Sequence, residues 1–294
     1  MKLNRLCNLE HWGEPDLTAA MRELLPYFMG AYPNFPVGVE HRKHWEFAQI
    51  LTGLRFLKAA HQDSWLLSVA GGHEETAYLL TNEARWVFLV DIYGAGTFTD
   101  IEAEASILQD PAKYARVPYN PRRLVVEYMN ALDLRFEANT FDGLFCSSSI
   151  EHFGSVPAAE KALAEMHRVL KPGGIAAITT ECIVDGTEPW ITPTLILFSP
   201  AMLGELAVSI PGLDLIEPID YSISPASMAA TYSHLEAVED AKRNFSRHPH
   251  IVLEREGRRF TSVSLFFRKS TTAVKTELPL LSRLRRLLPG GRRN

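Results

Sequence analysis

The sequence contains few cysteines and no cysteine motif. Cys7, Cys146 and Cys182 lie far apart among 294 residues, and no two of them form a CxxC pair. An odd number of scattered cysteines argues against both a disulfide framework and a zinc knuckle. The pairs His41/His44 and His248/His250 have a spacing compatible with metal binding, but no companion cysteine or carboxylate stands in a recognisable frame. We therefore expect no metal site.

The sequence also lacks an excess of basic residues and a long uninterrupted apolar run. The 30 Lys and Arg residues face 35 Asp and Glu residues, a formal charge of −5, whereas nucleic-acid-binding proteins need a basic face. The N-terminus has no apolar signal-peptide region, and the weakly charged stretch 194–213 is interrupted by Pro200 and Pro211. We expect a cytoplasmic protein with no nucleic-acid partner, in which this stretch forms a buried helix.

The chain alternates strand-like and helical patterns after an aromatic-rich beginning. In 41–59 the apolar residues recur at helical spacing, and the whole of residues 1–60 is expected to be helical. From Ser64 onward, short apolar runs alternate with helical patterns, which predicts βαβ units around a parallel sheet. The predicted strands are Trp65–Ala70, Val87–Asp91, Leu124–Asn130, Gly143–Ser147 and Gly174–Cys182, followed by runs at Leu213–Tyr221 and Thr261–Arg268.

The turn after the first of these strands is rich in small residues. Ala70-Gly71-Gly72 separates the strand from a helical pattern, so a ligand could approach backbone N–H groups there. Neither GxGxxG nor GK[ST] is present, which disfavours a nicotinamide dinucleotide and excludes a P-loop. Asp91 closes the next strand about 20 residues later, where an acid can accept hydrogen bonds from ribose hydroxyls. An ordinary turn and a solvated acid are the alternatives at this point.

Three motifs lie farther along the chain: Asp133-Leu-Arg-Phe with Thr140-Phe-Asp142, then Ser149-Ile-Glu-His152, then Arg168-Val-Leu-Lys-Pro-Gly-Gly174. In this order and spacing they resemble the motifs of the S-adenosylmethionine-dependent methyltransferases of the Rossmann-like class, type 11. The resemblance implies an α/β fold with a mostly parallel seven-stranded sheet, helices on both faces and an antiparallel last strand. The domains would be a helical cap at 1–60, a methyltransferase domain at 61–272 with an insertion at 222–259, and a basic tail at 273–294, which could weakly contact an acidic membrane surface.

The same resemblance implies a role for particular residues. Ala70, Gly71 and Gly72 would lie against the methionine part of S-adenosylmethionine, Asp91 would bind its ribose and Ile92 would lie against its adenine. Asn130, Ala131 and Leu132 would contact the adenine edge, and Ser147 and Ser148 would lie beneath the sulfonium. His152 would face the substrate as a candidate general base, unless it packs locally; Glu151, Glu181 and His234 are weaker candidates.

The glycine-rich turn departs from the family pattern. Ser68 stands where the family carries an acid that helps to balance the cofactor's ammonium group. Glu74 lies four residues after Ala70, at the start of the next helix, and we expect its carboxylate to supply the missing charge. The alternative is a residue that only favours the helix start through the helix dipole.

The predicted activity is methyl transfer from S-adenosylmethionine to an oxygen atom of a small-molecule or glycan acceptor. A non-catalytic methyltransferase-like protein and a nicotinamide-dependent enzyme are the alternatives. Aromatic residues in 1–60, among them Phe28, Phe35 and Trp45, are too apolar to face water together. We therefore expect this segment to form part of the roof of the active site.

Overall fold

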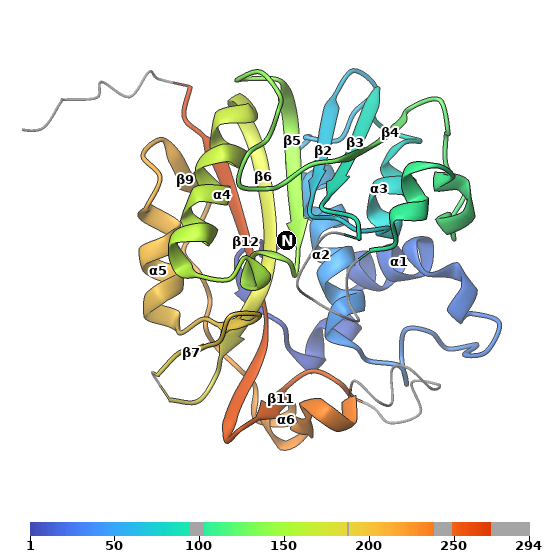
Figure 1. The fold of residues 1–294 in the computed structure, drawn as a ribbon. Helices are drawn as coiled ribbons and strands as arrows, with labels where there is room; N and C mark the ends of the chain where they lie inside the picture. Colours follow the sequence, from blue (N-terminus) through green and yellow to red (C-terminus); the bar gives the residue numbers. More distant parts are fainter. Residues whose placement is uncertain (95–102, 187, 238–248, 272–294) are drawn as a thin grey trace, which may run out of the picture.

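The computed structural model describes residues 1–94, 103–186, 188–237 and 249–271. The predicted tail at 273–294 and His248 lie outside the described residues, as does part of the predicted insertion. The centre of the molecule is one large sheet with helices on both sides (Figure 1).

The central sheet contains the seven strands that the sequence predicts. Five of them run parallel in the order β4, β3, β2, β5, β6, and β12 pairs antiparallel with both β6 and β9. Their bounds are Leu124–Tyr128 (β4), Trp86–Asp91 (β3), Trp65–Val69 (β2), Phe141–Ser147 (β5), Leu170–Ile183 (β6), Arg258–Lys269 (β12) and Leu213–Leu215 (β9). The β2 strand is central, and the chain crosses from β4 over it to β5, so the order reverses beside β2. In open α/β sheets, ligands bind at such a reversal.

Three additional strands widen the sheet to ten in the described ranges, a correction to the expected seven. β1 (Arg5–Leu6) pairs antiparallel with β12, while β11 (Leu253–Arg255) pairs with β12 and β10 (Tyr232–Ser233) pairs with β11. The N-terminal segment is therefore not wholly helical. Strands of two or three residues are too short to show an alternating pattern in the sequence. A separate pair, β7 (Trp190–Ile191) and β8 (Ile196–Leu197), lies outside this sheet.

Helices cover the sheet from two sides and bury a separate core on each. Figure 1 shows α1, α2 and α3 on one side and α4 and α5 on the other, and the two hydrophobic clusters follow this division. The α-helices are Pro15–Leu24 (α1), Arg42–Phe56 (α2), Glu75–Leu80 (α3), Val156–Val169 (α4), Pro200–Val208 (α5) and Pro225–Ala229 (α6). Short 3-10 helices are Leu9–Gly13 (η1), Pro26–Phe28 (η2), Ala105–Leu108 (η3), Pro111–Tyr114 (η4) and Ile150–His152 (η5).

Local sequence explains where α4 and α5 begin. The Ser155 and Ser199 side chains cap these helices by accepting hydrogen bonds from Ala158 N and Met202 N, and a proline occupies the first turn of each. The helix expected across 194–213 covers only Pro200–Val208, because β8 precedes it. Among the described residues, no helix is long and apolar enough to cross a membrane.

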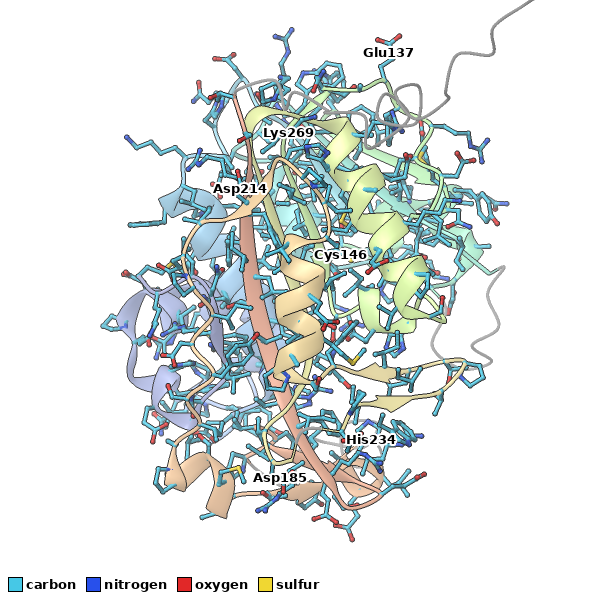
Figure 2. The ribbon with its side chains drawn as sticks, turned by 90° about the vertical axis from the view of Figure 1, so that its left-hand side faces the viewer. Glu137, Cys146, Asp185, Asp214, His234 and Lys269 are labelled. Atoms are coloured by element: carbon cyan, nitrogen blue, oxygen red, sulfur yellow. The ribbon has the colours of Figure 1, made fainter. Side chains whose placement is uncertain are left out.

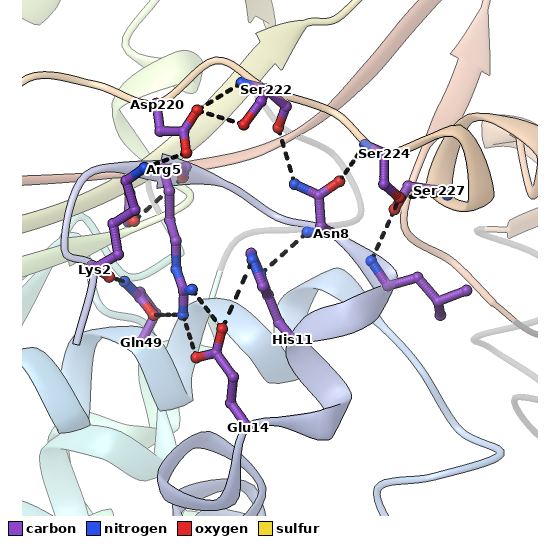
Figure 3. A network of polar contacts seen from close by, with 12 residues as sticks. Lys2, Arg5, Asn8, His11, Glu14, Gln49, Asp220, Ser222, Ser224 and Ser227 are labelled. Carbon is purple, nitrogen blue, oxygen red and sulfur yellow. Dashed lines mark hydrogen bonds and ion pairs between the residues drawn. The ribbon is translucent and has the colours of Figure 1, made fainter.

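The first residues of the chain are fixed to two distant segments (Figure 3). The Arg5 guanidinium donates two hydrogen bonds to Glu14, at 2.6 and 2.7 Å, and a third to Gln49 of α2. The Asn8 amide donates to the Ser222 carbonyl at 3.0 Å and accepts from Ser224 N at 2.7 Å. Residues 1–14 therefore join α2 to the segment that follows β9.

His11 lies in this network as a neutral ring. Its Nδ1 accepts a hydrogen bond from Asn8 N at 3.2 Å, which a proton on Nδ1 would abolish. Burial, followed by the nearby Arg5 charge, lowers the pKa of His11 to about 4. The unfolded chain binds a proton at about pH 6.5, so acidification from pH 6.5 to 4 favours unfolding. Burial lowers the pKa of His234 to about 4 as well, with the same consequence.

We expect the free energy of unfolding to fall on acidification from pH 6.5 to 4, with a His11 contribution of roughly 3 kcal/mol. The variant His11→Asn should lose part of this dependence in denaturant melts at a series of pH values. His61→Asn, at an exposed position, is the matched control and should keep the full dependence. An identical pH profile in His11→Asn and the wild type would contradict the assignment.

Candidate cofactor and acceptor site

The turn between β2 and α3 is tightly bent. Ala70 and Gly72 have φ angles of +51° and +53°, in the left-handed region. A Cβ atom on Gly71 would lie 1.9 Å from Ser68 Oγ and 2.7 Å from Leu89 Cδ1. The turn therefore packs directly on the sheet, and no side chain can be placed at Gly71 without displacing its neighbours.

The carboxylate of Asp91 connects the end of β3 to this turn. Its Oδ2 accepts a hydrogen bond from Gly72 N at 2.8 Å, and its Oδ1 accepts one from Ile92 N at 2.7 Å. Burial raises the pKa of Asp91, and these two backbone N–H groups act in the opposite direction. Each oxygen has a second acceptor position, so the fixed carboxylate can accept hydrogen bonds from a diol such as ribose.

One cavity of about 1210 Å³ lies along the carboxyl ends of β2, β3 and β5. Small-molecule sites commonly occupy about 300–1,000 Å³, so this cavity has room for a cofactor and a small acceptor together. The residues that the sequence assigns to the cofactor, together with the leading candidate base His152, all line it: Ala70, Gly71, Gly72, Glu74, Asp91, Ile92, Asn130, Ala131, Leu132, Ser147, Ser148 and His152. The structure thus brings the predicted residues to one place, while their individual roles stay predictions.

Asn130 follows β4 and shapes the turn at one end of the cavity. Its side-chain oxygen accepts a hydrogen bond from Leu132 N at 2.8 Å, and its carbonyl accepts one from Asp133 N. An asparagine side chain commonly closes a turn two residues on in this manner. The turn places Ala131 and Leu132 along the cavity wall.

Glu74 and Ser147 present buried polar atoms that have no hydrogen-bond partner among the described residues. They are Glu74 Oε2 and Ser147 Oγ, and both residues line the cavity. Glu74 stands at the N-cap of α3, yet its side chain makes no capping hydrogen bond. Burial, followed by the charge of Glu75, raises the pKa of Glu74 well above its usual value. A cationic ligand group would compensate this carboxylate, so the donors and acceptors here fit the ammonium of S-adenosylmethionine.

The N-terminal segment forms a large part of the cavity wall, as the sequence predicts. Eight of its residues line the cavity: Leu25, Tyr27, Phe28, His41, Lys43, His44, Glu46 and Phe47. Sequence reasoning missed Lys43 and Glu46 because no motif marks them. A polar stripe of Arg42, Glu46 and Gln49 at helical spacing on the buried face of α2 is the signal that could have found them.

Lys43 reaches the end of β5 from α2. Its ammonium group donates a hydrogen bond to Ser148 Oγ, and Ser148 Oγ donates to Glu151 Oε1 at 2.6 Å. Ser148 has a φ of +47°, an unusual conformation for a residue other than glycine. Glu151 lies behind Ser148, is fully buried and does not itself line the cavity.

His152 is the candidate base that does line the cavity. Its Nδ1 lies 2.7 Å from the carbonyl oxygen of Thr194. A carbonyl oxygen only accepts, so Nδ1 carries the proton of the neutral ring and Nε2 carries the basic lone pair. The weaker candidates Glu181 and His234 are not among the lining residues. Figure 2 shows His234 near Asp185 at one end of β12, far from Asp214 and Lys269 at the other.

Of the histidines with metal-compatible spacing, His41 lies close to both His44 and His250. The ring centroids of His41 and His44 are 5.2 Å apart, and those of His41 and His250 are 5.0 Å apart. Within the described ranges, no group of three or more His, Cys, Asp or Glu side chains is arranged to hold a metal ion. Burial lowers the pKa of His41 well below its usual value, so its ring is neutral in the folded protein.

Comparison with known proteins bears on this site. Residues 87–178, from β3 to β6, match the family model of a methyltransferase domain. The fold is similar to that of solved methyltransferase structures. The expected α/β fold is therefore confirmed.

Individual relatives show how far this similarity extends. The chain is 33% identical to the probable methyltransferase ltbC of Aspergillus luteorubrus over 122 residues, which are 35% of this chain and 43% of that protein. The geranyl diphosphate C-methyltransferase of Streptomyces coelicolor A3(2), solved with Mg²⁺, geranyl diphosphate and S-adenosyl-L-homocysteine, superposes with a TM-score of 0.51 at 15% identity. The superposition covers 76% of this chain and 77% of that one. The [4+2]-cyclase SpnF superposes with a TM-score of 0.50 at 18% identity, and the superposition covers 87% of this chain and 97% of that one.

We expect Glu74→Gln to weaken the binding of S-adenosylhomocysteine about ten-fold or more, because a charge-assisted hydrogen bond contributes about 1.5–3 kcal/mol. A carboxyl with a raised pKa binds a proton in the folded state, so it costs stability as pH rises above its usual value of 4.5. The melting temperature of the free variant at pH 7–8 should therefore be unchanged or higher. Titration calorimetry and thermal melts measure the two effects. Unchanged affinity with a melting temperature several degrees lower would show that Glu74 only supports the helix start.

Proposed function

We propose that the protein transfers the methyl group of S-adenosylmethionine to an oxygen atom of a small-molecule or glycan acceptor. The observation that carries the proposal is the convergence of the predicted residues on one cavity, at the point where the strand order reverses. The S-adenosyl-L-homocysteine bound by the similar geranyl diphosphate methyltransferase supports the choice of cofactor. The cavity volume supports an acceptor bound beside it.

The residues of this chain would bind the cofactor in three parts. Asp91 would accept hydrogen bonds from the ribose, with Ile92, Asn130, Ala131 and Leu132 around the adenine. Gly71 and Gly72 give the methionine part close access to the backbone, and the Glu74 carboxylate would face its ammonium group. When bound, the cofactor supplies a methyl group activated by positive sulfur. The protein must then align that group with the acceptor oxygen and keep water away.

His152 would take the proton that the acceptor hydroxyl loses. In such a transfer the carbon–sulfur bond breaks, a carbon–oxygen bond forms and the hydroxyl proton goes to Nε2. The hydrogen bond between Nδ1 and Thr194 would hold the ring in the required tautomer. The aromatic wall from η2 and α2, including Phe28 and Phe47, would exclude water from the acceptor.

A methyltransferase-like protein without methyl-transfer activity is the second candidate. The similar fold of the cyclase SpnF supports this candidate, because it shows that a shared fold does not by itself determine the reaction. A nicotinamide-dependent enzyme is the third candidate and lacks the glycine motif that it would need.

Titration calorimetry with S-adenosylhomocysteine and, separately, with NAD distinguishes these candidates. We expect binding of S-adenosylhomocysteine and no binding of NAD. In Asp91→Asn the affinity should fall about ten-fold or more, because the ribose hydroxyls lose their charged acceptor. Glu127→Gln, at an exposed position on the neighbouring strand β4, is the control and should bind as the wild type does. Transfer of labelled methyl from S-adenosylmethionine to a panel of hydroxylated acceptors would then separate an enzyme from a binding protein. Binding of NAD alone would overturn the proposal.

A further inference from the structure

A group of five charged residues, four of them buried, lies at one wall of the cavity. Arg42, Lys43 and Glu46 come from α2, Glu151 from η5 and Glu181 from β6. Four of these residues are nearly or fully buried, with relative exposures of 4% for Arg42, 0% for Glu46, 0% for Glu151 and 4% for Glu181. Lys43 and Glu46 line the cavity directly. The group contains three carboxyl groups and two cations.

The two cations of this group directly contact only two of its three carboxyl groups, Glu46 and Glu181. Arg42 donates hydrogen bonds to Glu181 and, at 3.2 Å, to Glu46, while Lys43 lies 3.5 Å from Glu46. Burial lowers the pKa of Arg42, but Glu181 and Glu46 outweigh this effect and raise it. Burial likewise raises the pKa of Glu181, but Arg42 outweighs it and the pKa is lowered. Arg42, Glu46 and Glu181 therefore form a charged cluster.

Glu151 is left without a cation in direct contact. Its two oxygens accept hydrogen bonds from Ser148 Oγ at 2.6 Å and from Thr180 Oγ1 at 2.8 Å, and no ion pair to Glu151 occurs among the described residues. A buried carboxylate is costly unless a positive charge compensates it. Its donor Ser148 lines the cavity, so a ligand charge can compensate Glu151 across a single side chain.

The strand order indicates which part of the cofactor lies there. From β3 through β2 to β5, the carboxyl ends present Asp91, then Ala70, then Ser147 and Ser148. The β5 end touches the glycine turn, since Ser149 Oγ donates a hydrogen bond to the Ala70 carbonyl at 2.8 Å. With the ribose at Asp91 and the ammonium group at Glu74, the sulfur that joins these two parts would lie over the ends of β2 and β5. Ser148 and Glu151 are on this side.

We propose that Glu151, acting through Ser148, makes the site prefer the positively charged methyl donor to its demethylated product. This inference rests on the proposed function. The sulfonium of S-adenosylmethionine carries one positive charge more than the thioether of S-adenosylhomocysteine. Lys43 already compensates Glu151 in part across Ser148. Loss of the methyl group would remove the further compensation that the sulfonium supplies, so the wall would weaken product binding and favour product release. Glu151 touches no reacting atom in this scheme and acts as a positioning residue.

Proton release supplies a readout that a purely structural role would not change. Burial raises the pKa of Glu151, and His152 and Lys43 act in the opposite direction. The other ionisable groups that act on it or that it acts on are Glu181 on β6, Arg42 on α2 and Cys146 on β5. A bound sulfonium favours the ionised carboxyl group, so its binding should release protons and strengthen as pH rises. Binding of the thioether should show less of both effects.

Titration calorimetry with sinefungin, which carries an ammonium group where the sulfonium would be, and with S-adenosylhomocysteine tests this inference. In Glu151→Gln the affinity for sinefungin, relative to that for S-adenosylhomocysteine, should fall about ten-fold, because the added positive charge loses the attraction of a nearby carboxylate. The affinity for S-adenosylhomocysteine itself should stay close to that of the wild type. Lys43→Met removes a cation from the same wall and should shift the ratio in the opposite direction. Titration in buffers of different ionisation enthalpy should show less proton release in Glu151→Gln.

Two control variants separate this effect from general damage to the site. Glu74→Gln should weaken both ligands alike, because both carry the methionine ammonium group, and so leave the ratio unchanged. Glu205→Gln removes one charge from an exposed position on α5 and should change neither affinity.

An affinity ratio that stays the same in both Glu151→Gln and Lys43→Met would overturn the inference and leave the proposed function intact. If Glu151→Gln does not fold, the affinity ratio of Lys43→Met alone tests the inference. This variant should fold, because the Lys43 side chain is one-third exposed at the cavity wall. Absence of binding by both ligands to the wild type would instead overturn the proposed function.

Discussion

Buried charges on α2 must be compensated, and this constraint ties the N-terminal segment to the sheet. Arg42 and Glu46 are buried on one face of the helix, where an isolated charge would be costly. Arg42 donates to Glu181 at the end of β6, and Ser262 of β12 donates to Glu46. The helix can therefore occupy only the position in which these strand ends meet it.

The position of α2 in turn determines the shape of the cavity. Lys43 follows Arg42 directly, so the same placement brings its ammonium group to Ser148 at the end of β5. The aromatic residues of η2 and α2 then close the space above the carboxyl ends of β2, β3 and β5. At its start the chain is held by Arg5 and Asn8, which link α2 to the segment after β9 (Figure 3). The segment that precedes β2 in the sequence thus forms much of the cavity wall.

The cavity has a carboxyl group on either side of the glycine turn, at Glu74 and at Asp91. Ser68 cannot supply a carboxylate, and its hydroxyl lies under Gly71, where there is no room for a larger side chain. Glu74 carries a carboxylate into the cavity from the start of α3, six residues later. Asp91 remains at the end of β3, where two backbone N–H groups orient it. The cavity thus has an acidic side chain at each end of the proposed cofactor position, Asp91 at one and Glu74 at the other.

The sequence determined the parts of this protein that depend on local pattern. Apolar runs such as Val87–Asp91 predicted the parallel strands, because strand propensity acts over a few residues. The motifs around Asp91, Asn130 and His152 predicted which residues would line a site. Only the tertiary structure decided what depends on contacts between distant segments. Neither the two-residue strand β1 nor the contact of Lys43 with Ser148 has a local signature, because each forms only when segments more than 100 residues apart pack together.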